Sequence, residues 1–130
     1  CGSCHGEQHH TPDEIAANNG LATSYSDNGV GKLTYNVSEM GFFKVPTLRN
    51  ISLTAPYMHD GSISSLPEVI EHYNIGIVNH PNLSAQLKDE YGNPRQFNFT
   101  QEEKEALLSF LNTLTDNDFI TAERYADPFK

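Results

Sequence analysis

The first five residues, Cys1-Gly2-Ser3-Cys4-His5, form a CxxCH pentapeptide, which is typical of c-type haem attachment. Two thiols three residues apart on one helical turn can reach the two vinyl groups of one porphyrin. The residue that follows can point its imidazole at the iron. We therefore expect thioether bonds from Cys1 and Cys4, with Nε2 of His5 as the proximal ligand. A carbonyl that accepts a hydrogen bond from the other ring nitrogen would fix the tautomer of His5.

Two other chemistries fit the same residues. A CxxC redox disulfide is expected within a βαβ pattern, and the sequence shows no such pattern. A zinc site needs four ligands at suitable angles, and the opening ten residues offer five candidates: Cys1, Cys4, His5, His9 and His10. The pentapeptide favours haem, and zinc stays open at this point.

When one histidine holds a haem, the second axial position is either open or filled by another ligand. A thioether there would give a high-potential electron-transfer haem, whereas a phenolate would hold ferric iron and lower the potential. Any single candidate could instead be a core filler or a surface side chain. By chemistry alone the candidates are Met40, Met58, His59, His72, Tyr73 and His80.

Capping residues predict the helices that must position these groups. Thr11 and the proline after it predict a short helix over about 12–18. Ser65, with Glu68 three residues later, predicts the start of a helix over 65–74. On that helix one inward face is expected to carry Val69, Ile70 and Tyr73, with His72 pointing elsewhere.

A capping box at Thr100 and Glu103 predicts a third helix over 101–114. Its apolar stripe is expected to hold Ala106, Leu107, Phe110, Leu111 and Leu114. The rest should be irregular or extended: a loop over 19–41, an extended segment over 42–46, one helical turn within 47–52, an ordered turn over 54–62, irregular chain over 75–99 and a packed irregular arm over 116–130. These elements predict an all-α domain of three to five helices with long ordered loops.

Composition narrows the function. The 130 residues are enough for a single domain over 1–130, and only 37% of them are hydrophobic, so a bound cofactor could add burial. A net charge of −9 excludes a basic nucleic-acid footprint and argues against docking on anionic lipid. No stretch is apolar enough to span a membrane. The two cysteines lie too close together to act as a disulfide scaffold.

Beyond the pentapeptide, the runs FFKVPTLRNISLTAPYMHDGSISSLPEVIEHYN and LLSFLNTLT resemble the C-terminal haem domain of the bacterial di-haem cytochrome c peroxidase/MauG superfamily. The resemblance covers most of residues 1–115. It implies a cytochrome c-like fold around a covalent haem c, in the C-terminal part of a longer chain whose N-terminal haem domain is missing. In this family the N-terminal haem reacts with peroxide and the C-terminal haem stores and relays electrons.

The resemblance also implies residue roles. Cys1, Cys4 and His5 match the attachment motif. The peroxidase branch places its distal methionine in a segment L-x-E-x-V-x-x-M-G, and here Tyr73 occupies the methionine position, as a tyrosine ligand does in the MauG branch. Met58, in the loop TAPYMHDG, is the second choice. His59 is expected to hydrogen-bond a propionate or the backbone, and Arg49 to pair with a propionate.

A calcium ion between the two domains is a further implication of the family. Backbone carbonyls of a Thr-x-Pro bind it, and Thr54 and Pro56 match that piece, with a plain turn as the alternative reading. An asparagine of the missing domain would complete the site.

The resulting hypothesis is an oxidoreductase: a haem domain of a periplasmic bacterial di-haem peroxidase. The alternative is a non-catalytic c-type electron carrier, and a zinc or apo Cys/His module is the third hypothesis. The expected partners are the N-terminal haem domain of the same chain and a small electron-donor protein, with a homo-oligomer as a further candidate.

Overall fold

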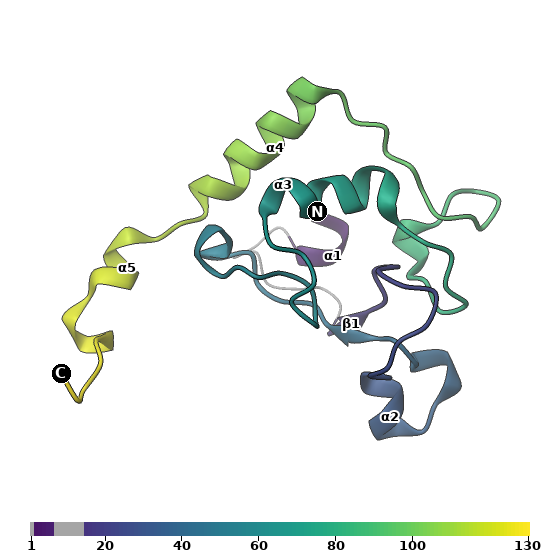
Figure 1. Cartoon of the computed structure of the whole chain (residues 1–130), viewed down its shortest axis with the longest axis horizontal. Coiled ribbons are helices and arrows are strands. Elements are labelled where there is room, and N and C mark those ends of the chain that lie inside the picture. Colours follow the sequence, from purple (N-terminus) through teal and green to yellow (C-terminus); the bar gives the residue numbers. More distant parts are fainter. Residues whose placement is uncertain (1, 7–14) are drawn as a thin grey trace.

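The computed structural model describes residues 2–6 and 15–130. In this part of the chain, short helices and one pair of strands are joined by long loops and 3-10 turns (Figure 1). No described helix has the length and apolar character needed to cross a membrane. The helices are α1 (Gly2–His5), α2 (Val30–Thr34), α3 (Leu66–Glu71), α4 (Gln101–Thr113) and α5 (Asn117–Thr121), and the strands are β1 (Ala16–Ala17) and β2 (Phe43–Lys44).

The predicted starts of α3 and α4 are confirmed. At α3, the Ser65 hydroxyl accepts from Glu68 N at 3.4 Å, and the Glu68 carboxylate accepts from Ser65 N at 3.0 Å. Thr100 and Glu103 repeat this reciprocal pair at α4, with distances of 3.2 and 2.8 Å. Each box satisfies two backbone donors that a helix start leaves unpaired.

The helix predicted over 65–74 changes character after Glu71. It continues as a π-helical turn over His72–Gly76, two residues past the predicted end. A π turn holds one more residue per hydrogen-bonded ring than an α turn, which changes the direction of the side chains that follow. This turn carries His72 and Tyr73, so the face predicted for these two residues from α-helical spacing does not apply.

Two small hydrophobic clusters make up the described core. The first joins α3 to α4, and the second follows the π turn and includes Tyr73 at its edge. Ile70 therefore does not share one packed face with Tyr73, because Ile70 packs in the first cluster and Tyr73 against the second, and Val69 is a member of neither cluster. The buried members are Leu48, Leu66, Ile70 and Leu111 in the first, and Ile77, Leu83 and Leu87 in the second.

The stripe predicted on α4 is correct at Leu111, which is buried, and at Leu107 and Leu114, which pack against the first cluster. It is wrong at Ala106 and Phe110, which are exposed, and it omits Leu108, which packs against the cluster.

A two-stranded antiparallel sheet corrects the all-α prediction. Ala16 pairs with Lys44 and Ala17 with Phe43. The helix predicted over 12–18 is therefore wrong for its described part, and its residues 12–14 lie outside the described residues. The extended segment over 42–46 is confirmed, and its pairing with β1 is the non-local contact that overrides the local helix signal.

Several loops carry more structure than predicted. The segment 19–41 contains α2 and a 3-10 turn over Val37–Glu39, and the predicted helical turn lies at Ile51–Leu53. The ordered turn over 54–62 is confirmed: Tyr57 packs against the first cluster, and its hydroxyl donates to Ile51 O at 2.9 Å.

The C-terminal arm is not the packed irregular segment that was predicted. It contains α5 and a 3-10 turn over Glu123–Tyr125, and it runs away from the body of the molecule (Figure 1). Its large apolar side chains are exposed, namely Phe119, Ile120, Tyr125 and Phe129.

A buried polar network fixes the segment Asn18–Gly20. Asn18 is fully buried, its backbone N–H donates to Ser84 Oγ at 3.0 Å, and its carbonyl accepts from Ser84 N at 3.1 Å. Its side-chain amide donates to Nδ1 of His80 at 3.1 Å, and the same nitrogen accepts from Asn82 N at 3.0 Å. Because a backbone N–H can only donate, His80 is neutral with its proton on Nε2.

Gly20 should tolerate no side chain. Its φ is +66°, and an added Cβ would lie 2.7 Å from Ile77 Cγ2 and 2.9 Å from Val78 O. We expect Gly20→Ala to lower the free energy of unfolding by more than about 2 kcal/mol, combining left-handed strain with overpacking. Gly92→Ala is the matched control, because Gly92 has φ +83° with nothing within 4 Å of the added Cβ. Urea unfolding should give a cost of about 1 kcal/mol there, and equal costs at the two glycines would contradict the packing argument.

Stability should fall as the pH drops below neutrality because of His80. Burial lowers the pKa of this imidazole below its usual 6.5. The unfolded chain then binds more protons than the folded chain, so the free energy of unfolding falls as pH decreases through about 6.5. His80→Asn, which keeps a side-chain acceptor, should reduce the slope of this dependence in thermal unfolding between about pH 7 and 5, and the rest comes from His72, whose pKa burial also lowers. His59→Asn, at an exposed position outside the network, is the control, and an equal slope in wild type and His80→Asn would refute the assignment.

Candidate haem site

The proximal side is organised by His5, at the end of α1. Its Nδ1 donates to the carbonyl of Pro46 at 2.9 Å. Since a carbonyl oxygen only accepts, the proton lies on Nδ1 and Nε2 keeps its lone pair for a metal. The expected carbonyl partner is therefore present. Cys4 is half-buried beside it, and Cys1 lies outside the described residues.

Tyr73 has a desolvated hydroxyl. Burial raises the pKa of this phenol, a hydrogen bond with the Asn19 side chain acts to lower it, and a charge on the Cys4 thiol raises it. The influence of Cys4 places the attachment motif and the Tyr73 hydroxyl in one electrostatic neighbourhood. A thioether at Cys4 would carry no charge, and that upward contribution would disappear.

The sequence predicts that His72 points away from the inward face of its helix, but His72 is buried. Its Nε2 donates to the backbone carbonyl of Asn19 at 3.1 Å, and its ring meets Tyr73 edge to face, with centroids 5.1 Å apart. Burial lowers the pKa of this imidazole, so it is neutral at pH 7. Its Nε2 carries a proton and is not available as a metal ligand in this arrangement.

Met58 comes to the same place from the loop 54–62. Its sulfur accepts a hydrogen bond from Nδ2 of Asn19 at 3.2 Å. Its backbone is left-handed, with φ +71°, which a non-glycine residue rarely adopts. The two leading distal candidates, Tyr73 and Met58, thus share one neighbour, Asn19.

The other axial candidates lie in different surroundings. His80 belongs to the buried Asn18 network. Met40 has its backbone carbonyl bound by the Asn82 amide at 3.0 Å. His59 is exposed and stacks on Phe43 with ring centroids 3.6 Å apart.

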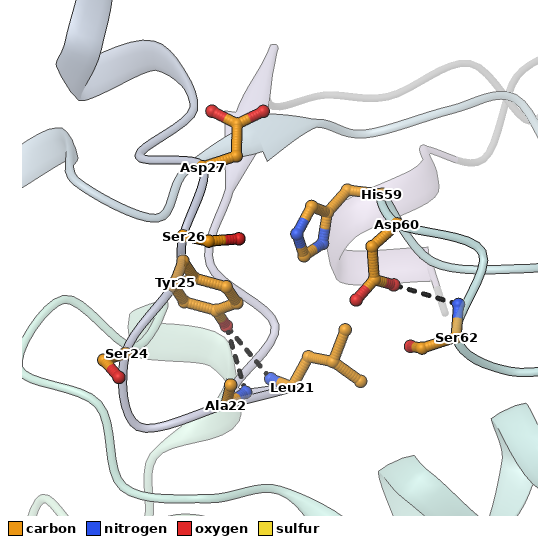
Figure 2. A pocket seen from close by; sticks show the side chains of 9 residues that line it. All are labelled: Leu21, Ala22, Ser24, Tyr25, Ser26, Asp27, His59, Asp60 and Ser62. Atoms are coloured by element: carbon orange, nitrogen blue, oxygen red, sulfur yellow. Dashed lines mark hydrogen bonds between the residues drawn. The ribbon is translucent and has the colours of Figure 1, made fainter.

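His59 also lines an open cavity of about 460 Å³. Figure 2 shows His59 and Asp60 on one side of this cavity and Tyr25 on the other. A hydrogen bond with the Ser62 side chain is the main cause that lowers the pKa of the Asp60 carboxyl, and the carboxylate also accepts from Ser62 N at 3.0 Å. Nothing in these contacts links the cavity to His5.

The remaining predicted residues lie at the surface. Arg49 is exposed, and its backbone N–H donates to Thr47 Oγ1 at 3.3 Å. Thr54 and Pro56 are exposed, and the Thr54 hydroxyl donates to Ile51 O at 3.1 Å, as in a plain turn. Their roles toward propionate and calcium stay predictions.

Within residues 2–6 and 15–130, no group of three or more His, Cys, Asp or Glu side chains is arranged so that it could hold a metal ion. Of the five zinc candidates, Cys4 and His5 are described, and Cys1, His9 and His10 lie outside the described residues.

Asn18 and Asn19 are the site residues that sequence reasoning misses. Asparagines next to glycine predict a turn, and nothing local marks these two as buried. The sequence signal that could have found them is the Asn-Asn-Gly run itself. Each asparagine side chain can donate and accept hydrogen bonds, and the glycine after them permits close approach of the backbone to its neighbours.

The donor set fits a c-type haem. The His5 imidazole is oriented by Pro46, a thiol of the attachment motif precedes it, and a phenol and a thioether are both neighbours of Asn19. A histidine nitrogen with either a phenolate or a thioether as the second ligand is a known haem ligation pattern.

Comparisons with known proteins identify the family of the chain. The chain is 35% identical over 116 residues to the methylamine utilization protein MauG of Methylorubrum extorquens, which covers 88% of this chain and 30% of that protein. It is 33% identical over 89 residues to the cytochrome-c peroxidase IdrP1 of Denitromonas iodatirespirans, covering 68% of this chain and 22% of the peroxidase.

A solved structure of a MauG-like protein associated with microbial copper homeostasis matches with a TM-score of 0.79 at 36% identity, over 100% of this chain and 46% of that one. No family model matches the chain. The chain spans less than a third of the length of these two curated relatives. From its sequence identity to both, over two thirds or more of its residues, the chain belongs to the MauG/di-haem cytochrome c peroxidase superfamily.

Proposed function

We propose that residues 1–130 are the C-terminal haem c domain of a periplasmic di-haem peroxidase, and that they relay electrons to a peroxide-reactive haem in an N-terminal domain of the same protein. One observation carries the proposal: an imidazole anchored on Pro46, directly after Cys4, in the same neighbourhood as the buried Tyr73 hydroxyl. Membership of the family and the oxidoreductase names of the relatives support it.

Each residue then has a defined task. Cys1 and Cys4 tether the haem, and the bond from His5 to Pro46 O orients the imidazole and keeps Nε2 unprotonated. Tyr73 would hold the haem on the side opposite His5, where ferric iron would have to displace the phenol proton against the raised pKa that burial gives this hydroxyl. When bound, the haem would supply a one-electron store. With His5 and Tyr73 both holding it, this domain would leave no place for peroxide and would serve the other haem.

Further assignments follow from the same proposal. Arg49, which is exposed, pairs with a propionate in this proposal, and the carbonyls of Thr54 and Pro56 contribute to a calcium site completed by the N-terminal domain. That domain and a small electron-donor protein are the proposed partners.

Loss of both thioethers should reveal the role of this domain. In the full-length protein matured in a periplasm, we expect the double variant Cys1→Ser/Cys4→Ser to have one covalent haem fewer per chain by pyridine haemochrome and mass spectrometry. Peroxide turnover with a reduced donor should fall at least about tenfold, because the electron path is broken. Colourless wild-type protein would refute the proposal. Haem-loaded wild type without peroxide turnover would favour the alternative, a non-catalytic electron carrier.

The distal ligand can be tested separately. Tyr73→Phe in the haem-loaded full-length protein should abolish the phenolate signature of this haem in absorption and EPR spectra, because the ligand oxygen is gone. Met58→Ala should leave that signature in place. The reverse result, an unchanged spectrum in Tyr73→Phe and an altered one in Met58→Ala, would transfer the distal role to Met58.

A further inference from the structure

The C-terminal arm, residues 116–130, is fixed to the body of the molecule at its base. There Asn50 N donates to Leu114 O at 2.9 Å, and Asn50 Oδ1 accepts from Asp116 N at 2.7 Å. The hydroxyls of Ser52 and Thr115 bond each other at 2.6 Å. The start of α5 is therefore held against the turn that contains Ile51–Leu53, and the arm projects from the body at that point (Figure 1).

The arm is ordered, yet its apolar side chains face solvent. Asp116 caps α5 by accepting from Phe119 N at 2.9 Å, and the rings of Phe119 and Tyr125 pack on each other with centroids 4.7 Å apart. That pair and Ile120 are still about half exposed, and Phe129 is 94% exposed. Because so short a segment cannot build a core of its own, these side chains form a surface that fits a partner.

The apolar area of the arm is too small to hold two separate molecules together. A large aromatic side chain buries about 150–250 Å², so four partly covered apolar side chains supply on the order of 500 Å². Separate proteins that form a standard interface bury about 800 Å² on each partner. A domain on the same chain needs less area, since the linker gives it an effective concentration on the order of millimolar.

Charge also argues against a second copy of the chain as the partner. The arm carries four acidic and two basic side chains, and the 130 residues have a net charge of −9. Contact between two such chains would bring like charges together. An apolar surface with basic side chains around it would fit the arm better.

The comparison with the MauG-like structure indicates where such a surface could lie. That structure matches over 100% of this chain, the arm included, and the match takes up only 46% of its own chain. More than half of that protein therefore lies outside the part that corresponds to residues 1–130. A protein built in this way has a second body on the same chain that can cover the arm.

We propose that the C-terminal arm is a contact surface for the N-terminal domain of the same protein. The apolar side chains of the arm pack on an apolar surface of that domain, and basic side chains at its rim face the acidic groups of the arm. This inference rests on the proposed function only in requiring that an N-terminal domain exists. The surface consists of Phe119, Ile120, Tyr125 and Phe129.

Photo-crosslinking in the haem-loaded full-length protein tests the contact. With Phe129→p-benzoylphenylalanine, mass spectrometry should find the crosslink on residues that precede Cys1 in the same chain. Tyr35→p-benzoylphenylalanine is the matched control, because Tyr35 is 88% exposed and follows α2, which lies on the opposite side of the molecule from α5 (Figure 1). The control should not reach the same N-terminal residues.

Hydrogen exchange in the same protein gives a second measurement. Phe129→Ser removes little packing within the described residues, since Phe129 is almost fully exposed there. We nevertheless expect the amides of α5 and of the turn Glu123–Tyr125 to exchange at least about tenfold faster, because burying a large apolar side chain shifts an opening equilibrium by more than a factor of ten. Tyr35→Ser should leave these amides unchanged.

Several results would overturn the contact. They are crosslinks from Phe129 to a second copy or to residues 1–115, no crosslink at all, crosslinks from both positions to the same N-terminal residues, and exchange that Phe129→Ser leaves unchanged. Each would leave the proposed function intact, because haem content and peroxide turnover are measured separately. Wild-type protein without covalent haem would overturn the proposed function, while crosslinks to residues before Cys1 would still support the contact.

Discussion

The hydrogen bond from His5 to the carbonyl of Pro46 is the contact on which the rest of the site depends. It joins positions 41 residues apart and sets both the rotation and the tautomer of the imidazole. Pro46 is placed by the strand before it, where β2 pairs with β1 and Val45 N donates to Ile15 O at 3.1 Å. The two-residue sheet and the Val45 N–H bond thus help to hold this carbonyl in place.

The opposite side of the site is held by polar contacts rather than by packing. Asn18, His80 and Ser84 are buried, and their hydrogen bonds have fixed directions. A satisfied polar network in a low-dielectric interior restricts orientation as well as position, whereas apolar packing alone would restrict position only. The backbone next to Asn18 is therefore held in one orientation, and it includes the Asn19 carbonyl that accepts from His72.

Features encoded by neighbouring residues could be predicted, and those set by distant contacts could not. The boxes at Ser65 and Thr100 are local in sequence, and both are present. The CxxCH spacing is equally local, and it identifies His5. The strand at Ala16–Ala17 depends on Phe43–Lys44, far along the chain, so its local Thr-Pro-Asp-Glu start indicates a helix that does not form over the described residues.

The π turn over His72–Gly76 shows that the direction of a candidate site residue can also lie beyond prediction from neighbouring residues. Tyr73 is identifiable by its residue type and by its place in the motif, but its direction depends on one extra residue in the helical ring, which no periodicity reveals.

The turn separates the two hydrophobic clusters, and the described residues bury only eight hydrophobic side chains in all. A domain of this size with so small an apolar core gains stability from any group that binds its folded state alone. Covalent attachment at the first turn, as the proposed function has it, would make such binding permanent, so that loops that are polar and rich in glycine could hold precise ligand positions without a larger core.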